Sequence, residues 1–363
     1  MKTAGIIGLG LIGGSIAKTL KKRTEIKTVK AYDINASSLA KAKDDGAIDD
    51  ASNSDFSLFA DCDIVFICVP LPQIPQYIEK LAGTVKKGCL VTDVGSVKKS
   101  VIEKSGKYPD MQFIGGHPMA GSEKEGYTAS SDFLLENAYY IIVPSANASE
   151  DAVARFVALV EKFIAIPIIM TAAEHDGATA AISHAPHMAA AAIVNAVRKL
   201  GGDGETLAAL AAGGFKDITR IASSDSRLWQ SIANENRTEI IKVLDDYRLE
   251  LDEIIKYLKD GNETELGGYL RLAKDYRDNM PSAGRAKFIE TYDLYADITD
   301  KPGSIAVVAT ILGMNGVNIK NIGIINNREY QGGALQIMFG SKTDLESGAE
   351  LLKNSGFHIH IKK

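Results

Sequence analysis

Cysteine is scarce in this chain of 363 residues, which has only Cys62, Cys68 and Cys89. Three cysteines at uneven spacings fit neither a disulfide framework nor a zinc ribbon, so we expect buried thiols in a reducing compartment. Long apolar runs are also lacking, and no segment has the length and apolarity needed to span a bilayer. Residues 3–17 are uncharged and imitate a secretory signal peptide, but their glycines have another explanation, a nucleotide-binding turn. The sequence therefore predicts a cytoplasmic protein that does not enter a membrane.

An excess of positive charge is absent as well. The chain has 41 Lys and Arg against 46 Asp and Glu, a net charge of −5, and no cluster of basic residues stands out. This balance argues against a broad nucleic-acid surface. The HExxH pattern of zinc enzymes does not occur, so we expect no metal. The composition, 45% hydrophobic and 24% charged, is typical of globular proteins, and the length predicts two or three domains.

Glycine, by contrast, is concentrated near the N-terminus. Residues 3–8 are a short apolar strand and residues 11–22 a helix, and Gly8, Gly10 and Gly13 lie at their junction in GxGxxG spacing. Gly8 permits a tight turn, Gly10 leaves room for a pyrophosphate against backbone N–H groups, and Gly13 allows close helix–strand packing. The pattern predicts a dinucleotide-binding domain; the alternative is a glycine-rich turn in an unrelated α/β fold.

The second strand, residues 27–33, indicates which dinucleotide is bound. It ends at Asp33, whose carboxylate can accept hydrogen bonds from a ribose 2′-hydroxyl. The same carboxylate would repel a 2′-phosphate, and the residues that follow offer no arginine to hold one. We therefore expect NAD rather than NADP.

Strands and helices continue to alternate up to about residue 171. Apolar runs predict parallel strands over 63–70, 89–96 and 111–118, with helices over 74–85 and 96–106. A strand at 138–144, a helix at 149–163 and a last strand at 165–171 follow.

Four residues follow or end these strands. Val69, Pro70, Ser96 and His117 all come at carboxyl ends, the edge where open α/β sheets bind ligands. The stretch around His117, GGHPMAG, has the glycine and proline that helices and strand interiors avoid. We therefore expect His117 on a loop at a strand end, projecting toward the nicotinamide.

The middle of the chain is helical. The Ala-rich segment 172–200 predicts one long helix, bent locally by Pro186, with His184 and His187 three residues apart on one face. These histidines allow three interpretations: a hydrogen-bonded core pair, a metal site shared with His117, or the polar lining of a substrate pocket.

The stretch 211–229 is the other informative part of the middle. Gly213 and Gly214 interrupt the helical pattern, Arg220 follows, and Trp229 is the only tryptophan of the chain. An arginine beside such a break suits bidentate binding of a carboxylate, and the alternative is a salt bridge at the surface or between helices. Residues 234–279 predict charged, amphipathic helix.

The tail has a different periodicity. Residues 277–287 are a plausible linker, after which the patterns predict β, α, β, β, α and β in that order, the order of a ferredoxin-like module. The predicted elements cover 288–298, 301–316, 317–327, 333–340, 345–356 and 357–362.

The ordered set of motifs resembles bacterial prephenate dehydrogenases of the tyrosine pathway that carry a C-terminal ACT regulatory domain. The resemblance spans essentially the whole chain, and one small departure is AGGF where some relatives have a third glycine or a proline. The motifs are GLGLIGGS (8–15), DVGSVK (93–98), GGHPMAGSE (115–123), SHAPH (183–187), AGGFKDITRIASSD (212–225) and DKPGSIA (300–306).

The resemblance implies three domains of different fold class. They are an α/β Rossmann-type NAD-binding domain at 1–171, an all-α dimerisation domain at 172–280, and an α+β ferredoxin-like ACT domain at 288–363. The implied partners are prephenate, NAD, a second copy of the chain joined through the helical domain, and tyrosine as effector.

The resemblance also implies a reaction and its catalytic residues. NAD⁺ would take a hydride from C4 of prephenate, the ring would lose CO₂ and become aromatic, and the product would be 4-hydroxyphenylpyruvate. His117 would take the proton of the 4-hydroxyl as a neutral imidazole. Ser96 would bridge His117, this hydroxyl and the cofactor.

Further roles come from the same resemblance. Arg220 would bind the ring carboxylate, and Glu123 would be a gating carboxylate. Trp229 would reach the neighbouring subunit's site in an intertwined dimer. His184, His187 and Gly213 would line the substrate pocket. The cofactor would contact Gly8, Gly10, Gly13, Asp33, Val69, Pro70 and Ser96, and tyrosine would contact Asp300, Pro302, Gly303, Asn318 and Asn321.

Other activities fit parts of this pattern. Arogenate dehydrogenases share the quoted motifs, and no residue decides between an amino and a keto group on the substrate. A β-hydroxyacid dehydrogenase would need a helical lysine where the chain has ISHAPHMAA. A non-catalytic, NAD-responsive regulator would not need Ser96, His117 and Arg220. The tail could also be a purely structural dimerisation module.

Overall fold

The computed structural model describes residues 1–121, 124–200, 205–280, 292–299, 301–325 and 334–361. They form two compact units, Met1–Tyr269 and Leu270–Lys363. Among the described residues, no helix is long and apolar enough to cross a membrane. The three cysteines are free thiols, and burial raises the pKa of both Cys62 and Cys89 to about 12.

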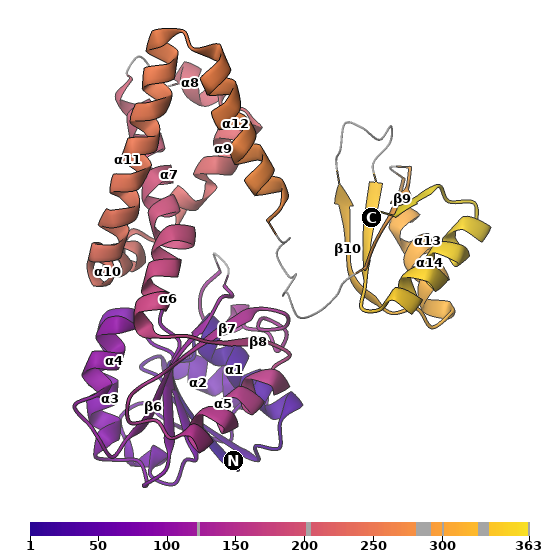
Figure 1. Cartoon of the computed structure of the whole chain (residues 1–363). Helices are drawn as coiled ribbons and strands as arrows, with labels where there is room; N and C mark the ends of the chain where they lie inside the picture. The colour runs from indigo at the N-terminus through magenta and orange to yellow at the C-terminus, as the bar shows by residue number, and fades with distance from the viewer. Residues whose placement is uncertain (122–123, 201–204, 281–291, 300, 326–333, 362–363) are drawn as a thin grey trace. The chain divides into compact units, whose positions relative to one another are not determined.

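The first unit is built on one sheet (Figure 1). Neighbouring strands are parallel except β6 and β7, which pair antiparallel. The strands lie in the order β3-β2-β1-β4-β5-β6-β7-β8, with the bounds Asp50–Ser52, Thr28–Tyr32, Thr3–Ile7, Ile64–Ile67, Leu90–Asp93, Gln112–Pro118, Tyr139–Pro144 and Ile166–Ile169.

Helices cover both faces of the sheet, as Figure 1 shows. On one face lie α1 (Leu11–Arg23), α2 (Ala36–Asp44) and α5 (Glu150–Lys162), whose apolar side chains form one core with the strands. On the other lie α3 (Ile74–Ala82) and α4 (Lys99–Ser105), which share a second core. Because the strands are buried on both sides, each fully buried Ile or Phe contributes about 1.5–3 kcal/mol. These cores hold the strand ends in place.

The junction of β1 and α1 has the expected glycine geometry. Gly8 has φ +94°, a conformation that favours glycine. A Cβ at Gly13 would lie 1.9 Å from the carbonyl oxygen of Gly8, so only glycine lets α1 pack this close. A Cβ at Gly10 would meet nothing within 4 Å, which leaves open space above the start of α1.

His117 is in a strand, so the expected loop position is wrong. It lies in β6 and pairs with Ile141 of β7. Glycine is favoured beside it because a Cβ at Gly116 would lie 2.6 Å from the backbone oxygen of Asp93. Gly116 therefore permits close packing of β6 against β5, and Gly115 leaves room for the side chain of Lys98, without ending the strand.

The start of α4 also differs from the prediction. The helix begins at Lys99 and not at Ser96, and Ser96 lies in the connection from β5. The Asp93 carboxylate accepts a hydrogen bond from the backbone N–H of Gly95 at 2.8 Å, which holds this connection in a turn. Most other boundaries shift by a few residues, as in α3, which ends at Ala82.

The expected long helix over 172–200 is three segments. α6 (Ala172–Thr179) begins in a capping box between Thr171 and Glu174, runs into a π-helical turn, Ala180–His184, and continues as α7 (Ala185–Lys199). Pro186 lacks an N–H and its ring crowds the preceding turn, which accounts for the wider π turn there.

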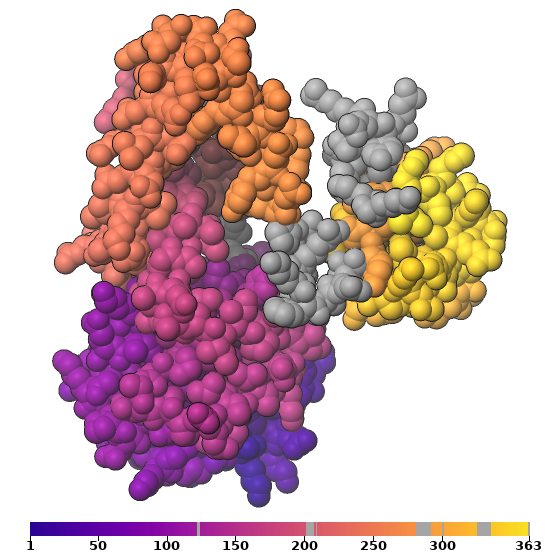
Figure 2. All heavy atoms as spheres, in the orientation of Figure 1, coloured from indigo at the N-terminus to yellow at the C-terminus, as the bar shows by residue number. Residues whose placement is uncertain are grey.

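The rest of the first unit is helical. α8 (Glu205–Leu210) and α9 (Gly213–Thr219) are separated at the predicted glycine break, and a 3₁₀ turn, Arg220–Ser223, follows α9. α10 (Ser226–Glu235) leads to α11 (Arg237–Asp260). The predicted helix over 234–279 is interrupted at Gly261, which has φ +61° and precedes α12 (Glu263–Asp278). In Figure 2 the helical residues up to 269, in pink and orange, lie above the indigo and magenta part that contains the sheet.

The second unit contains the ferredoxin-like module. Its sheet is antiparallel in the order β10-β11-β9-β12, packed with α13 and α14 around a separate core. The elements are β9 (Tyr292–Asp297), α13 (Ser304–Met314), β10 (Ile319–Ile325), β11 (Ala334–Phe339), α14 (Lys342–Asn354) and β12 (Ile359–Ile361). The predicted βαββαβ order is confirmed.

The residues expected to bind an effector are at the surface of this module. Pro302 and Gly303 are exposed in the turn before α13, where Gly303 has φ +92°. Asn318 and Asn321 are exposed at and just before β10, which is an edge strand. Asp300 lies outside the described residues, as do the linker residues 281–287 and the expected domain start at residue 288.

Candidate active site

A pocket of about 240 Å³ lies at the carboxyl edge of the sheet, above the glycine turn. The carboxylate of Asp33 accepts hydrogen bonds from the backbone N–H of Leu9 at 2.5 Å and of Asn35 at 2.7 Å. No lysine or arginine lines this pocket among the described residues. The lining residues are Gly8, Gly10, Tyr32, Asp33, Ile34, Cys68, Val69, Pro70, Gln73 and Tyr77.

The pocket suits one end of a dinucleotide. The start of α1 has no side-chain cap at Gly10, so backbone N–H groups of its first turn remain for an anion. Asp33 is fixed in place by its two backbone donors, and each carboxylate oxygen retains a further lone pair for a ribose hydroxyl. The sequence-predicted residues Gly8, Gly10, Asp33, Val69 and Pro70 all line this one pocket.

A fully buried ion pair lies at the end of β5. The ammonium of Lys98 contacts the carboxylate of Asp93, and both side chains have no exposed surface. Asp93 also accepts hydrogen bonds from the backbone N–H groups of Gly95 at 2.8 Å and Gly116 at 3.2 Å. Burial lowers the pKa of Lys98, and the attraction of Asp93 opposes this effect. Asp93 therefore links the β5–α4 connection, which contains Ser96, to β6, the strand that contains His117.

The imidazole of His117 lies beside this pair. Its Nδ1 is 2.8 Å from Nε2 of His175, and the residue as a whole is partly buried. Desolvation lowers the pKa of His117 well below its usual value, and the neighbouring His175, Lys98 and His184 lower it further. His117 is therefore a neutral imidazole at pH 7, able to accept a proton.

His175 is the residue that the sequence analysis missed. It is fully buried in α6, and its Nδ1 lies 2.7 Å from Oδ1 of Asp176. Asp176 also accepts hydrogen bonds from the backbone N–H groups of Lys98 at 2.7 Å and Lys99 at 2.9 Å. The available signal was a His-Asp dipeptide in the first turns of a helix that starts at the sheet edge.

The paired histidines of the helical part lie together with Trp229. The ring of His187 stacks on the indole of Trp229, with 3.5 Å between centroids and 12° between planes. His184 is buried, lies 3.1 Å from Nδ2 of Asn236 through its Nδ1, and meets Trp229 edge-on. Burial lowers the pKa of His184 to about 4. Trp229 thus contacts both histidines within its own chain.

His187 has an incomplete hydrogen-bond set. Its Nδ1 is buried and finds no partner among the described residues. Such an atom is normally satisfied, so a bound polar group or water is expected to complete it.

The remaining predicted substrate residues are on the helical side. Gly213 begins α9, and Arg220 begins the 3₁₀ turn that packs beside α7, the helix of His187. The side chain of Arg220 is exposed. Ser96 is half-buried in the connection after β5, next to the strand of His117. Glu123 lies outside the described residues.

A metal centre finds no support in the part of the chain that the structure describes. No group of three or more His, Cys, Asp or Glu side chains there is arranged to hold an ion. The close imidazole contact at the sheet edge instead joins His117 to His175.

Two family models match most of the first unit. One is described as prephenate dehydrogenase, nucleotide-binding domain, and matches residues 16–168. The other is described as prephenate dehydrogenase, dimerization domain, and matches residues 171–272. Together they cover the sheet of the first unit except β1 and the last residue of β8, and most of the helices of that unit.

Known proteins agree with these matches. The prephenate dehydrogenase of Bacillus subtilis is 38% identical over 355 residues, which is 96% of this chain and 95% of the relative. A crystal structure of prephenate dehydrogenase from A. aeolicus in complex with hydroxyphenyl propionate and NAD⁺ has a TM-score of 0.74 at 31% identity, covering 77% of this chain and 99% of that one. Synechocystis arogenate dehydrogenase has a TM-score of 0.70 at 32% identity, covering 76% and 99%.

Proposed function

The chain belongs to the prephenate dehydrogenase family, and we propose that it converts prephenate to 4-hydroxyphenylpyruvate by NAD⁺-dependent oxidative decarboxylation. The observation that carries this proposal is a neutral imidazole, His117, held at the same sheet edge as the dinucleotide pocket. A hydroxyl that becomes acidic as its carbon is oxidised needs such a proton acceptor.

NAD⁺ is the cofactor, and the pocket above Gly10 fits it. When bound, NAD⁺ accepts a hydride from C4 of the substrate. Gly10 offers open space and uncapped N–H groups for the pyrophosphate, and Asp33 offers lone pairs for the ribose. The absence of lysine and arginine from the described lining supports NAD⁺ over its 2′-phosphorylated form.

His117 acts as the general base. Its low pKa keeps the ring neutral, so its free nitrogen accepts the proton of the 4-hydroxyl as C4 is oxidised. Ser96, on the adjacent connection, is suited to bridge this hydroxyl and His117 through its own hydroxyl group. Loss of the ring carboxylate as CO₂ then makes the ring aromatic.

The helical side supplies the groups that hold the substrate. Arg220 binds the ring carboxylate, for which the planar guanidinium provides paired donors. His187 offers an imidazole for the polar side chain of the substrate, with His184 behind it and Gly213 offering backbone groups. Glu123 is proposed, from the family resemblance alone, to gate the site.

Prephenate is favoured over arogenate as the substrate. The B. subtilis relative, which matches nearly the whole chain, is a prephenate dehydrogenase. Arogenate carries an ammonium where prephenate has a keto group, and buried ammonium groups need an anionic partner. Among the described residues, the direct contacts of His184 and His187 are to the amide of Asn236 and the indole of Trp229. The carboxylate of Asp176, which attracts the His184 ring, is already hydrogen-bonded to His175 and to two backbone N–H groups. Initial rates with each substrate at equal concentration test this choice, and a faster rate with arogenate would reverse it.

The enzyme forms a homodimer through its helical segment, the part matched by the dimerization model. Isolated large apolar side chains are common at surfaces, but several on one helix mark an interface. On α11 the exposed ones are Ile241, Tyr247, Leu249, Leu251, Ile255 and Leu258. Trp229 is proposed, from the resemblance, to reach the partner's site as well as stacking on His187.

Tyrosine is the proposed effector, bound by the ferredoxin-like module. The exposed turn at Pro302 and Gly303 and the exposed Asn318 and Asn321 provide backbone and amide groups for an amino acid. Asp300 belongs to the same proposed site. End-product inhibition would then follow from binding at the module, and a purely structural module is the alternative.

A further inference from the structure

We propose that His175 and Asp176 are positioning residues that hold His117 in the tautomer with a free Nε2 and stabilise its imidazolium form. The inference rests on the proposed role of His117 as the general base. A chain of two hydrogen bonds supports it. Nδ1 of His117 lies 2.8 Å from Nε2 of His175, and Nδ1 of His175 lies 2.7 Å from Oδ1 of Asp176. These residues come from β6 and α6, which are far apart in the sequence.

The tautomers of both histidines follow from Asp176, the last member of this chain of hydrogen bonds. Asp176 is a carboxylate and can only accept, and it already accepts from the backbone N–H groups of Lys98 and Lys99. Nδ1 of His175 must therefore donate to Asp176, which leaves Nε2 of His175 as an acceptor. Nδ1 of His117 must then donate to His175, so Nε2 of His117 carries the free lone pair.

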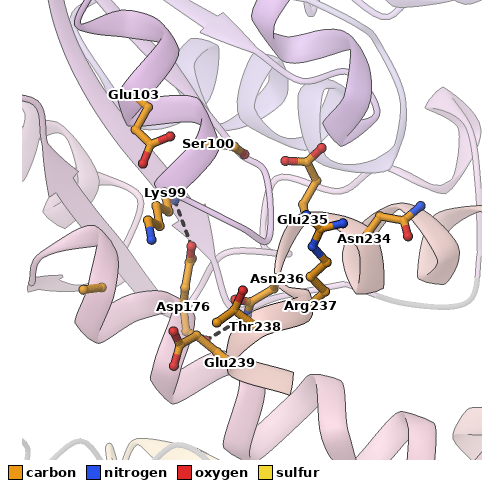
Figure 3. A pocket seen from close by; sticks show the side chains of 11 residues that line it. Lys99, Ser100, Glu103, Asp176, Asn234, Glu235, Asn236, Arg237, Thr238 and Glu239 are labelled. Carbon is orange, nitrogen blue, oxygen red and sulfur yellow. Dashed lines mark hydrogen bonds between the residues drawn. The ribbon is translucent and has the colours of Figure 1, made fainter. Parts of the chain in front are cut away.

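The ionised state of Asp176 anchors this arrangement. Burial raises its pKa, but hydrogen bonds from His175 and from the backbone of Lys98 and Lys99 outweigh this, and the pKa lies below its ordinary value. Figure 3 shows the carboxylate of Asp176 turned toward the backbone at Lys99. Asn236 donates to the backbone oxygen of Asp176 at 2.8 Å and so fixes the residue from the start of α11. Asp176 is held from three sides.

During the reaction His175 and Asp176 would stabilise a transient positive charge on His117. The C–H electron pair at C4 leaves to NAD⁺, the O–H pair forms the C4 carbonyl, and the proton goes to Nε2 of His117. The electron pair of the carboxylate bond enters the ring as CO₂ leaves, and the resulting phenolate oxygen takes the proton back. The imidazolium exists between these events, beside the cationic Lys98. The negative charge of Asp176, acting through His175, offsets that unfavourable neighbour.

Several charged or titratable groups outside this chain of hydrogen bonds also lie near His117, His175 and Asp176. Lys98 of the β5–α4 connection and His184 of the π turn act on His117, and Lys98 is itself paired with Asp93 at the end of β5. On its other side Asp176 forms part of the wall of a polar pocket of about 500 Å³, which Glu103 of α4 and Glu239 of α11 also line (Figure 3). Glu103 is an exposed carboxylate of this pocket outside the chain of hydrogen bonds, so it offers a matched control.

The test compares His175→Gln, Asp176→Asn and the control Glu103→Gln in the full-length enzyme. We expect the first two to lower kcat by about 10- to 100-fold with little change in KM for NAD⁺, and the control to match the wild type. His117→Ala is measured in parallel. If His117→Ala is inactive while His175→Gln and Asp176→Asn keep kcat within about twofold, the inference fails and the proposed function stands. If His117→Ala is fully active, the proposed function itself fails.

A second measurement remains decisive if a variant folds poorly. ¹⁵N spectra of histidine-labelled wild-type enzyme distinguish a protonated from an unprotonated ring nitrogen. We expect His117 and His175 both to carry the proton on Nδ1 at pH 7, with assignment from the His117→Ala and His175→Gln samples. Asp176→Asn places an amide that can donate beside His175, and we expect it to perturb both tautomers. A wild-type His117 protonated on Nε2 would overturn the inference.

Discussion

Nδ1 of His117 lies 2.8 Å from Nε2 of His175, although 58 residues separate them in the sequence. One histidine comes from strand β6 and the other from the first helix after the sheet, α6. The bond therefore forms only when the helical part packs onto the sheet edge. Catalysis by His117 depends on that packing as well as on the sheet itself.

The pH dependence of activity follows from the low pKa of His117. The neutral ring is the active form, and desolvation favours it, so protonation begins only well below the usual histidine range. We expect kcat/KM to stay level as the pH falls from 7 through about 6.5, the ordinary histidine pKa, and to decline only at lower pH. A kcat/KM profile with NAD⁺ saturating measures this. A decline centred on the ordinary value would show that the base is not desolvated.

Two glycines of the nucleotide turn give a matched pair of variants. Gly10→Ala places its Cβ in open space, so we expect an unchanged Tm but a KM for NAD⁺ raised by about tenfold, because the pyrophosphate is displaced from backbone donors.

Gly13→Ala instead places its Cβ 1.9 Å from the oxygen of Gly8. Such overpacking costs about 1–3 kcal/mol and lowers Tm by roughly 3–10 °C. Thermal unfolding and NAD⁺ kinetics of both variants check this contrast, and a large loss of Tm in Gly10→Ala would contradict it.

Arg220 is tested through the affinity for substrate. Its side chain is exposed in this structure, so its hydrogen bonds to the ring carboxylate are worth about 1.5–3 kcal/mol rather than the larger value of a buried pair. We expect Arg220→Ala to raise KM for prephenate by roughly 10- to 150-fold. Lys216→Ala, on the preceding helix α9, is the control for lost charge. Equal KM values for both variants would remove Arg220 from the site.

Tyrosine binding is tested by thermal shift. A ligand at about 100 times its Kd stabilises the protein by about 2.7 kcal/mol, so millimolar tyrosine should raise Tm measurably. We expect tyrosine also to suppress NADH formation, and Asn321→Ala to reduce the shift. Phenylalanine serves as the comparison amino acid. No shift with tyrosine would favour a structural role for the ferredoxin-like module.

The sequence predicted the parts of the site that depend on local patterns. Gly8 and Gly10 of the glycine turn, Asp33, and Val69 and Pro70 after the next strand line one pocket. They meet there because parallel strands bring their carboxyl ends to a single edge. The order of elements in the second unit was equally readable from the periodicity.

The remaining parts depend on contacts between distant segments. His175 and Asp176 gain their partners only when α6 packs against the start of α4 and the end of β6. His117 lies inside a strand because glycine at position 116 lets β6 approach β5 closely. In the sequence alone, the same glycines and the neighbouring proline predict a loop. The π turn before Pro186 likewise depends on how the helix is bonded across that residue.

The role of His117 is tested most directly by NADH formation from prephenate and NAD⁺, measured for the wild type and His117→Ala together with NAD⁺ affinity. We predict turnover by the wild type and a kcat about 10²- to 10⁴-fold lower in the variant, with NAD⁺ binding retained. Near-full turnover by His117→Ala, or no turnover of prephenate by a wild type that binds NAD⁺, would contradict this role.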